Sequence, residues 1–372
     1  MRFLMLNWRD PKNPLAGGAE RVTQAYLAAL HERGHEVYWY ANAFPGGSSE
    51  EVVDGIRIVR GGGKGGSILK AMQWYRRQES FDLVVDQHHG IPWFAPWWCR
   101  TNSIAYIHEV LGPIWSAFYP WPLSALGQVQ ERWTHWFYRN VPFWVGCEST
   151  KQALLRHSVR NVSVVSYGTD TVPLEDLEEK PLRQPLQLVA VSRLAPNKRV
   201  DHVIEAFGIL LRKGLQAQLT VIGSGEQEPR LREMARRPEL AGHITLTGQL
   251  SERDKNEHLR KAHLLLHTSI REGWGLNVLE ANAMGTPAVV YPVPGLVDST
   301  INGVTGWVTA AETPEAVAKT IQQLLRKPEE YERLRLQARD RARTFHWSYV
   351  LPRACAFLEE QARQGSDKRV SI

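Results

Sequence analysis

Two glutamates, Glu272 and Glu280, stand in one glycine-rich stretch with seven residues between them. Gly273 and Gly275 follow the first glutamate and leave the backbone bare, so N–H groups at the start of the next helix can contact an anion. We expect that anion to be a phosphate. Because a phosphate repels a neighbouring carboxylate, we expect Glu272 to bind sugar hydroxyls. Glutamates at this spacing are ordinarily solvated surface residues, but these surroundings favour a binding site.

The elements around the two glutamates follow a strand, loop, helix, strand pattern. Residues 262–267 are an apolar run short enough for a buried strand, and residues 276–284 predict a helix. Residues 285–287 end that helix with Gly and then Pro, and residues 288–291 predict a second buried strand. A β-α-β unit of this kind places its loop at the carboxyl edge of the sheet, where open α/β sheets bind ligands.

The segment EGWGLNVLEANAMGTPAVV, residues 272–290, resembles the Glu-x7-Glu signature of retaining GT-B glycosyltransferases of family four. The resemblance implies that Glu272 holds hydroxyls of the donor sugar and that Glu280 holds the ribose of the nucleotide. It also implies an α/β fold of the GT-B type, with two doubly wound Rossmann-like domains facing a central cleft. The loop and helix start then supply four further donor-binding residues: Gly273, Trp274, Gly275 and Leu276.

Two cations occupy another strand-to-helix loop. Arg193 and Lys198 follow the predicted strand 188–191 and precede the predicted helix 200–212, so they reach the same sheet edge as Gly273 and Gly275. Arginine can grip a phosphate through two hydrogen bonds, and lysine acts as a point charge. By resemblance they hold the donor diphosphate and belong, with Glu272, to the catalytic group. The alternative is a solvated basic loop.

Three further residues of this half are assigned by resemblance. Gly223 follows the strand 219–222, and the corresponding turn of the family lies near the nucleoside. Gly248 and Leu250 follow the strand 244–247, where the family's backbone reads the edge of the base. Further along, residues 302–306 contain an Asn-Gly pair and predict a hairpin.

The amino-terminal part contributes Gly17, Gly18 and His108. The Gly-Gly pair precedes a predicted helix, residues 20–32, and resembles the family's loop that approaches the donor phosphate and the acceptor. An ordinary strand-to-helix turn is the alternative. His108 follows the predicted strand 103–107 and resembles the histidine that contacts the donor sugar, as part of the catalytic group.

We expect no metal and no cofactor, only a nucleotide-diphosphate sugar as co-substrate. The pair His88–His89 has no carboxylate or cysteine at ligand spacing except Asp86, and no Asp-x-Asp occurs in the chain. Residues 61–66 contain a G-x-G-x-x-G pattern, but they follow a short strand and no acidic residue follows at the distance that dinucleotide binding requires.

Composition indicates a globular protein of two domains. The chain has 372 residues, enough for two hydrophobic cores, and no apolar run of the roughly 20 residues that a membrane span needs. We predict a first domain at 1–172, a linker at 173–187, a donor-binding domain at 188–347, and a helix 348–364 that packs back on the first domain as in GT-B enzymes. The three separate cysteines fit a reducing cytoplasm.

Charge and aromatic residues indicate the partners. The net charge of +6 favours anionic ones. Residues 115–139 combine Trp, Tyr and Phe with Arg, which indicates either core packing or a surface that faces anionic lipid. We therefore expect a glycan or lipid-linked acceptor and an enzyme that is cytoplasmic, with peripheral attachment to the cytoplasmic membrane face as the further possibility.

The resulting hypothesis is a retaining, metal-independent hexosyltransferase. It would move a hexosyl unit from a UDP- or GDP-sugar to an acceptor hydroxyl in the synthesis of cell-envelope glycan, polysaccharide or glycolipid. Two alternatives stay open: a nucleotide-sugar epimerase of GT-B fold, and a basic, Trp-rich protein that binds nucleic acid. Nucleic acid would require one stripe of cations, whereas Arg193 and Lys198 lie at strand ends beside two carboxylates, so we expect no nucleic-acid partner.

Overall fold

The structure is a computed structural model that describes residues 1–63, 65–88 and 90–370, with side chains up to residue 364 except at these gaps. The chain forms two compact units. The first unit comprises residues 1–111, 126–168 and the chain from 347 onward, and the second comprises 112–125 and 169–346. Both are mixed α/β units built on a largely parallel sheet.

The second unit contains six parallel strands in the order β11-β10-β9-β12-β13-β14. The chain starts at β9, builds outward to β11, and then returns to the other side of β9 with β12. The strand order therefore reverses between β9 and β12, and ligands of doubly wound folds bind at this point. The strands are β9 (Leu186–Val191), β10 (Ala217–Ile222), β11 (Ile244–Gly248), β12 (Leu264–His267), β13 (Ala288–Val290) and β14 (Gly306–Val308).

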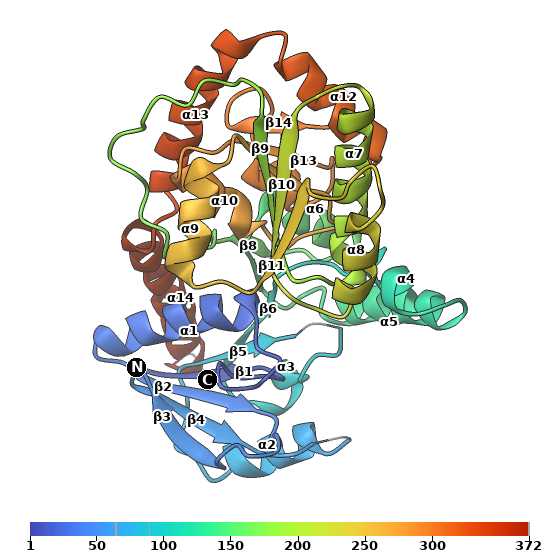
Figure 1. Ribbon diagram of the computed structural model, residues 1–372. Helices are drawn as coiled ribbons and strands as arrows, with labels where there is room; N and C mark the ends of the chain where they lie inside the picture. The colour runs from blue at the N-terminus through green and yellow to red at the C-terminus, as the bar shows by residue number, and fades with distance from the viewer. Residues whose placement is uncertain (64, 89, 371–372) are drawn as a thin grey trace. The chain divides into compact units, whose positions relative to one another are not determined.

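Helices cover both faces of this sheet (Figure 1). One face carries α7 (Val200–Arg212), α8 (Glu228–Ala235) and α12 (Pro314–Leu324), and the other carries α9 (Glu252–Lys261), α10 (Leu276–Ala283) and α13 (Pro328–Arg343). The central strands are almost wholly apolar and buried, as expected for a parallel sheet covered on both sides. Three short helices lie in loops: η1 (Pro196–Lys198), α11 (Leu296–Ser299) and α4 (Ile114–Phe118).

The first unit contains eight strands in the order β3-β4-β2-β1-β5-β6-β7-β8, and here the order reverses between β1 and β5. Every pair is parallel except β3 with β4. The strands are β1 (Arg2–Leu6), β2 (Glu36–Ala41), β3 (Glu50–Val53), β4 (Ile56–Arg60), β5 (Leu83–Gln87), β6 (Asn102–Ile107), β7 (Phe143–Val145) and β8 (Val162–Val164). Strand β3 was not predicted from the sequence, although the Asp54–Gly55 pair that joins it to β4 is a strong hairpin signal.

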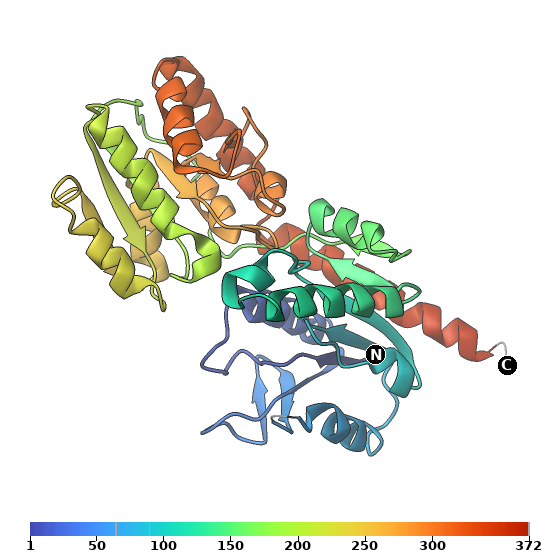
Figure 2. The ribbon, with the colours of Figure 1, turned by 90° about the vertical axis from the view of Figure 1, so that its right-hand side faces the viewer.

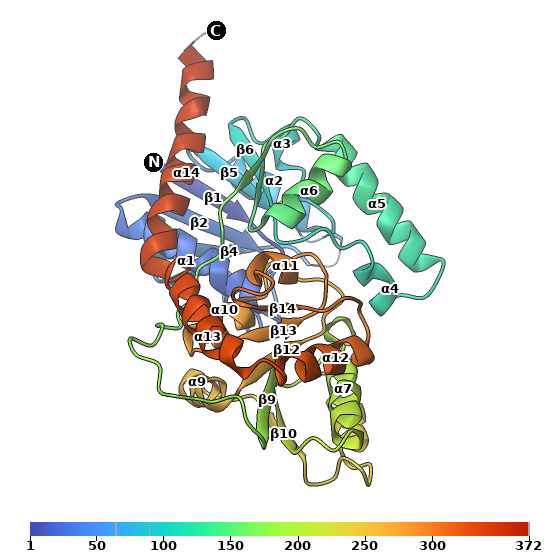
Figure 3. The same cartoon turned by 90° about the horizontal axis from the view of Figure 1, so that it is seen from above.

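The helices of the first unit are α1 (Gly18–Glu32), α2 (Ser67–Tyr75), α3 (Ala95–Trp98), α5 (Leu123–Phe137), α6 (Glu148–Arg156) and α14 (Trp347–Val370). Figure 3 shows α14 alongside α1. Glu359 on α14 binds Arg33 at 2.7 Å and His35 at 3.0 Å, both just after α1. These contacts fix the last helix to the first unit.

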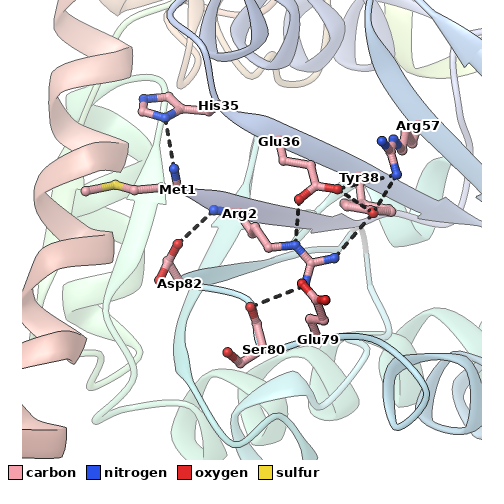
Figure 4. Close-up of polar contacts among 9 residues, drawn as sticks. All are labelled: Met1, Arg2, His35, Glu36, Tyr38, Arg57, Glu79, Ser80 and Asp82. Carbon is pink, nitrogen blue, oxygen red and sulfur yellow. Dashed lines mark hydrogen bonds and ion pairs between the residues drawn. The ribbon is translucent and has the colours of Figure 1, made fainter.

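Arg2 organises the amino-terminal edge of the first sheet (Figure 4). Its Nε donates to Glu36 at 2.7 Å, and its backbone N–H donates to Asp82 at 2.7 Å. Its guanidinium also lies 5.3 Å from the Tyr38 ring centroid. Charged side chains therefore satisfy one another at this edge, and the carboxyl edge is the one that open α/β sheets use for ligands.

Two segments differ from the sequence-based division. Residues 173–187, expected to be a linker, pack on the second unit: the Leu174 N–H donates to the Ala283 carbonyl at 3.0 Å, and Lys180 Nζ donates to the Arg260 carbonyl at 2.8 Å. Residues 112–125, expected in the first domain, group with the second unit.

The predicted hairpin at 302–306 is wrong. Gly303 N–H does donate to the Gly306 carbonyl at 2.9 Å, but the strand that follows, β14, pairs in parallel with β13. The Asn-Gly signal gave the local turn correctly, while the pairing depends on a strand that lies earlier in the chain. Among the described residues, no helix is both long and apolar enough to cross a membrane.

Candidate functional site

Glu272 lies in the loop after β12, beside the reversal of strand order in the second unit. Its Oε1 accepts hydrogen bonds from Lys198 Nζ at 2.6 Å and from Ser269 Oγ at 2.6 Å. The same oxygen lies 2.9 Å from His267 Nε2. The predicted donor residues Lys198 and Glu272 thus meet directly, whereas the contributions of His267 and Ser269 were not predicted. Both stand just before the motif, His267 at the end of β12 and Ser269 in the loop that follows it.

The charge of Glu272 is fixed by its neighbours. Burial alone would raise the pKa of this carboxyl, but the Lys198 ammonium and the hydrogen bond from His267 outweigh it and hold the pKa well below its usual range. Glu272 is therefore an anion with all three donors at one oxygen, and Lys198 supplies the compensating positive charge.

Lys198 and Arg193 both lie in the loop between β9 and α7, but their surroundings differ. The Lys198 side chain is only 18% exposed and is paired with Glu272. The Arg193 side chain is exposed and has no partner in the part of the chain that the structure describes. A guanidinium in this state can bind an anion without breaking an internal contact.

The backbone of this loop is shaped by two glycines. Gly275, with φ +83°, is the residue before α10, and no side chain caps that helix start. Gly295, also at φ +83°, lies so close to the loop that a Cβ would stand 2.1 Å from the Glu272 carbonyl oxygen. Glu272 N–H in turn donates to the Pro294 carbonyl at 3.1 Å. The amino terminus of α10 is therefore open, and Gly295 holds the Glu272 segment beside it.

Trp274 contributes differently from its neighbours in the motif. Its side chain is 6% exposed, and its ring packs against Phe345 with centroids 5.2 Å apart. Its backbone, like that of Gly273 and of Leu276, which begins α10, is the part that could contact a donor, and this role stays a prediction. The indole anchors the loop to the core.

Glu280 lies on α10 and is paired with a lysine that our sequence analysis did not single out. Lys255 Nζ on α9 lies 2.9 Å from Glu280 and 2.7 Å from Glu252. Burial works to lower the pKa of Lys255, but the carboxylate of Glu280 and then that of Glu252 raise it overall. Glu280 is thereby oriented from a neighbouring helix, and no local pattern in the sequence signals this contact.

The carboxyl ends of β9, β10 and β11 also come together. Gly223 N–H donates to the Gly248 carbonyl at 2.9 Å, and a Cβ on Gly223 would stand 1.9 Å from the Ser192 carbonyl. Leu250 is half-buried against the hydrophobic core. The predicted nucleoside residues thus share one sheet edge with Arg193, and Gly223 is required by the close approach of two strand ends.

His108, in the first unit, is held by a buried chain of hydrogen bonds. Thr23 Oγ1 donates to Gln87 Oε1 at 2.9 Å, so the Gln87 amide nitrogen donates to His108 Nε2 at 2.8 Å. His108 Nδ1 therefore carries the proton and donates to Tyr167 Oη at 2.7 Å. The ring is 9% exposed. Sugar binding by Nε2 would require Gln87 to be replaced, so the role of this side chain stays a prediction.

Helix α1 begins at Gly18, with Gly17 as the residue before it, two residues earlier than the predicted helix 20–32, and this helix start carries its own anion. Gly17 N–H donates to Glu20 Oε2 at 2.7 Å, and the Arg9 guanidinium lies 3.5 Å from Glu20 Oε1. A phosphate at this turn would have to displace or neutralise Glu20. The contact with donor phosphate stays a prediction for these two glycines.

Metal ligands do not gather in the part of the chain that the structure describes: no group of three or more His, Cys, Asp or Glu could hold an ion there. Asp86, the carboxylate next to the histidine pair, accepts hydrogen bonds from the backbone of Trp93 and Ala95 and from Tyr138. His88 lies 3.5 Å from it. His89 falls outside the described residues.

Comparison with solved structures supports the fold. The chain superposes on a sucrose-phosphate synthase from Thermosynechococcus elongatus with a TM-score of 0.78 at 19% identity, covering 98% of both chains. It also superposes on HepE from Anabaena, solved in complex with UDP-glucose, with a TM-score of 0.73 at 17% identity, covering 97% of this chain and 100% of that one.

Proteins with similar sequences include a glycogen synthase and a glycosyltransferase. A glycogen synthase from Mycobacterium tuberculosis (strain H37Rv) is 24% identical over 388 positions, covering 94% of this chain and 92% of that protein. A D-inositol 3-phosphate glycosyltransferase from Frankia alni is 32% identical over 170 positions, covering 43% of this chain and 42% of that protein.

Two family models match successive parts of the chain. The model for Glycosyltransferase Family 4 matches residues 16–172, and the model for Glycosyl transferases group 1 matches residues 175–341. The second match contains the paired Lys198 and Glu272 and the glutamate on α10. The chain therefore belongs to the glycosyl transferases group 1, and it is a glycosyltransferase of GT-B fold.

Proposed function

We propose that this glycosyltransferase is a retaining hexosyltransferase that uses a nucleoside diphosphate sugar, a UDP- or GDP-sugar, without a metal ion. The observation that carries the proposal is the ion pair of Lys198 with Glu272 at 2.6 Å, beside the open amino terminus of α10. Lys198 and the backbone N–H groups at the start of α10 can bind a phosphate. Glu272, directly beside them, can accept hydrogen bonds from sugar hydroxyls.

The donor diphosphate is assigned to Arg193, Lys198 and the backbone from Gly273 to Leu276. Arginine, lysine and a helix amino terminus each stabilise negative charge, and the charge on the diphosphate grows as the bond to the sugar breaks. Glu272 keeps one oxygen bonded to protein donors, so its Oε2 is assigned to hydroxyls of the sugar.

The nucleoside is assigned to Glu280, Gly223, Gly248 and Leu250. A carboxylate accepts two ribose hydroxyls well, and the Lys255 contact orients it for this. The solved complexes of HepE contain UDP or UDP-glucose, which supports a uridine donor as the first choice for testing.

The reaction breaks the bond between the sugar C1 and the leaving phosphate oxygen. A bond from C1 to the acceptor oxygen forms on the same face, and the proton of the acceptor hydroxyl passes to the departing phosphate. Positive groups that stabilise this phosphate therefore lower the barrier without a protein nucleophile. The names of the relatives include glycogen synthase and a poly(glycerol-phosphate) glucosyltransferase, which supports a glycan or polysaccharide acceptor.

Nuclear magnetic resonance of the reaction tests the proposal. With a UDP- or GDP-hexose and a glycan acceptor, the new linkage should have the anomeric configuration of the donor, and a chelator should leave the rate unchanged. Inverted configuration, or loss of rate on chelation, would contradict the corresponding part of the proposal. Conversion of the sugar nucleotide to its epimer without acceptor would identify an epimerase instead.

A further inference from the structure

Helix α5 carries an exposed apolar stripe. Leu126, Val129, Trp133 and Trp136 are spaced by three or four positions, so their side chains share one face of the helix. Their exposed fractions are 65%, 64%, 52% and 51%. Figure 2 shows α5 as the long teal-green helix, and Figure 3 shows it beside α6. Large apolar side chains in a row on a helix are unusual on a surface that contacts only water.

The stripe continues into an aromatic stack. The rings of Trp133 and Phe137 have centroids 5.3 Å apart, and those of Phe137 and Trp97 have centroids 4.1 Å apart. Trp97, on α3, is itself 49% exposed. Two helices of the first unit thus present one continuous apolar surface, stiffened by ring stacking.

The exposed charges of α5 and of the residues just after it are positive. Residues 110–130 contain no charged side chain, and the acidic residue of α5, Glu131, is 4% exposed and accepts from the Leu111 N–H. Arg132 is exposed within the stripe. Arg139 follows the helix with its guanidinium 4.3 Å from the Trp136 ring centroid, and its carbonyl accepts from the Arg160 N–H at 3.0 Å.

We propose that this surface, defined by Trp97, Leu126, Val129, Trp133 and Trp136 with Arg132 and Arg139, docks the protein on an anionic lipid headgroup layer. Tryptophan places an apolar ring and a polar N–H at the boundary of lipid and water, and arginine meets the anionic headgroups. The apolar stripe supplies insertion, while the arginines supply attraction, and lipid binding of this kind needs both.

A second copy of the chain fits the same surface less well. A twofold contact brings the same surface of two copies together, so Arg132 and Arg139 of both copies would gather in one interface to which α5 adds no exposed carboxylate. Lipid phosphates remove this repulsion. The positive charge of Arg132 and Arg139, together with the apolar stripe, therefore favours an anionic lipid layer over a second copy as the partner.

The inference rests on the proposed function in one respect: a membrane partner implies a lipid-linked acceptor only if the protein is the proposed hexosyltransferase. Its test contains no nucleotide, so the two fail separately. A failure to bind nucleotide would contradict the proposed function but not the lipid-binding surface. A failure to bind vesicles would contradict the lipid-binding surface but not the donor site.

Vesicle flotation of the full chain tests the inference. The protein should float with phosphatidylcholine vesicles that contain phosphatidylglycerol, less with pure phosphatidylcholine, and less at high salt because charge is screened. The pair Trp133→Ser with Trp136→Ser should weaken binding by about tenfold or more, given the apolar area removed. Since Trp133 stacks on Phe137, the pair Leu126→Ser with Val129→Ser is the second test and should weaken binding in the same direction.

Leu69→Ser with Tyr349→Ser is the matched control. These side chains are 64% and 60% exposed on α2 and α14 of the same unit, so their loss should leave vesicle binding unchanged. Three results would overturn the inference: no flotation with anionic vesicles, equal flotation with neutral vesicles at any salt, or equal loss in the control. A dimer in solution that both stripe variants dissociate, without vesicle binding, would assign the surface to a second copy.

Discussion

At the scale of single residues, Lys198 has the most direct consequence for donor binding. Lys198→Ala should weaken the binding of a nucleoside diphosphate by about 1.5–3 kcal/mol, the range of a charge-assisted hydrogen bond. Calorimetric titration measures this, and Lys213→Ala is the control, because the Lys213 side chain is exposed on the same unit and donates to Gln322 Oε1 at 3.0 Å. Equal affinity of wild type and Lys198→Ala would remove Lys198 from the phosphate site.

The two glutamates should separate sugar binding from nucleotide binding. Glu272→Ala should leave affinity for free nucleoside diphosphate at least as high, because Lys198 loses an internal partner, while turnover falls sharply. Glu280→Ala should weaken free nucleotide itself by about 1–3 kcal/mol, since ribose hydroxyls lose their acceptor. Calorimetric titration with the nucleotide and initial rates of transfer should be measured on both variants. If Glu272→Ala weakens nucleotide binding and Glu280→Ala does not, the assigned roles of the two glutamates are exchanged.

The residue types and spacing in the sequence predicted much of this site because the local pattern carries it. Glu272, Lys198 and Arg193 all follow apolar strands, so their place at one sheet edge could be inferred. The Lys255 contact to Glu280 could not, because it joins two helices through tertiary packing. The buried partners of His108 are of the same kind, and the inward turn of the Trp274 ring depends on Phe345 at the end of the unit.

At the scale of elements, the turn at Gly295 should be sensitive to an added side chain because it holds the Glu272 segment in place. Gly295→Ala would place a Cβ 2.1 Å from the Glu272 carbonyl oxygen, so the loop must move and turnover should fall strongly. Gly303→Ala is the matched control: its φ is +73° and nothing lies within 4 Å of its added Cβ, so it should show only the backbone strain of about 1–2 kcal/mol. Chemical unfolding and activity distinguish the two, and equal activity in both variants would contradict the role of Gly295.

The last helix should respond to pH through Glu359. Hydrogen bonds from Arg33 and then His35 lower the pKa of Glu359 to about 2, below the value of about 4.3 of an unfolded chain. Its stabilising effect is therefore complete above that unfolded value and is lost as the pH falls towards 2. Since Arg33 is 47% exposed, we expect Glu359→Gln to lower the free energy of unfolding by only about 1–2 kcal/mol at pH 7.

Denaturant unfolding of wild type and Glu359→Gln at falling pH tests this. The difference between them should shrink below about pH 4. Glu360→Gln, an exposed neighbour on the same helix, should show little effect at any pH. A difference that stays constant with pH would mean that Glu359 acts through packing and not through its charge.

Elements were predictable where their own residues determine them. Apolar runs predicted the parallel strands, and Gly285 with Pro287 predicted the end of α10. The prediction of a hairpin at 302–306 was wrong because β14 pairs in parallel with β13, and the turn before β14 does not determine that pairing. The edge strand β3 was missed because its four residues, two glutamates followed by two valines, lack the apolar alternation of a half-buried strand.

At the scale of the whole molecule, the division into two sheets was predictable from the restart of the strand pattern after residue 187. The packing of residues 173–187 was not, since their prolines and acidic residues are typical of a linker. Leu174 and Lys180 nonetheless find partners on the second unit, and such contacts become visible only when the fold brings them together.

The central claim is that the second unit binds a nucleoside diphosphate, and thermal unfolding of the full chain with a nucleotide panel tests it most directly. A bound ligand at about 100 times its dissociation constant stabilises the folded state by about 2.7 kcal/mol. UDP or GDP should therefore raise the melting temperature clearly, the corresponding monophosphate should raise it less because it lacks the second phosphate, and a chelator should change neither shift. An unchanged melting temperature with every nucleoside diphosphate and sugar nucleotide would contradict the account.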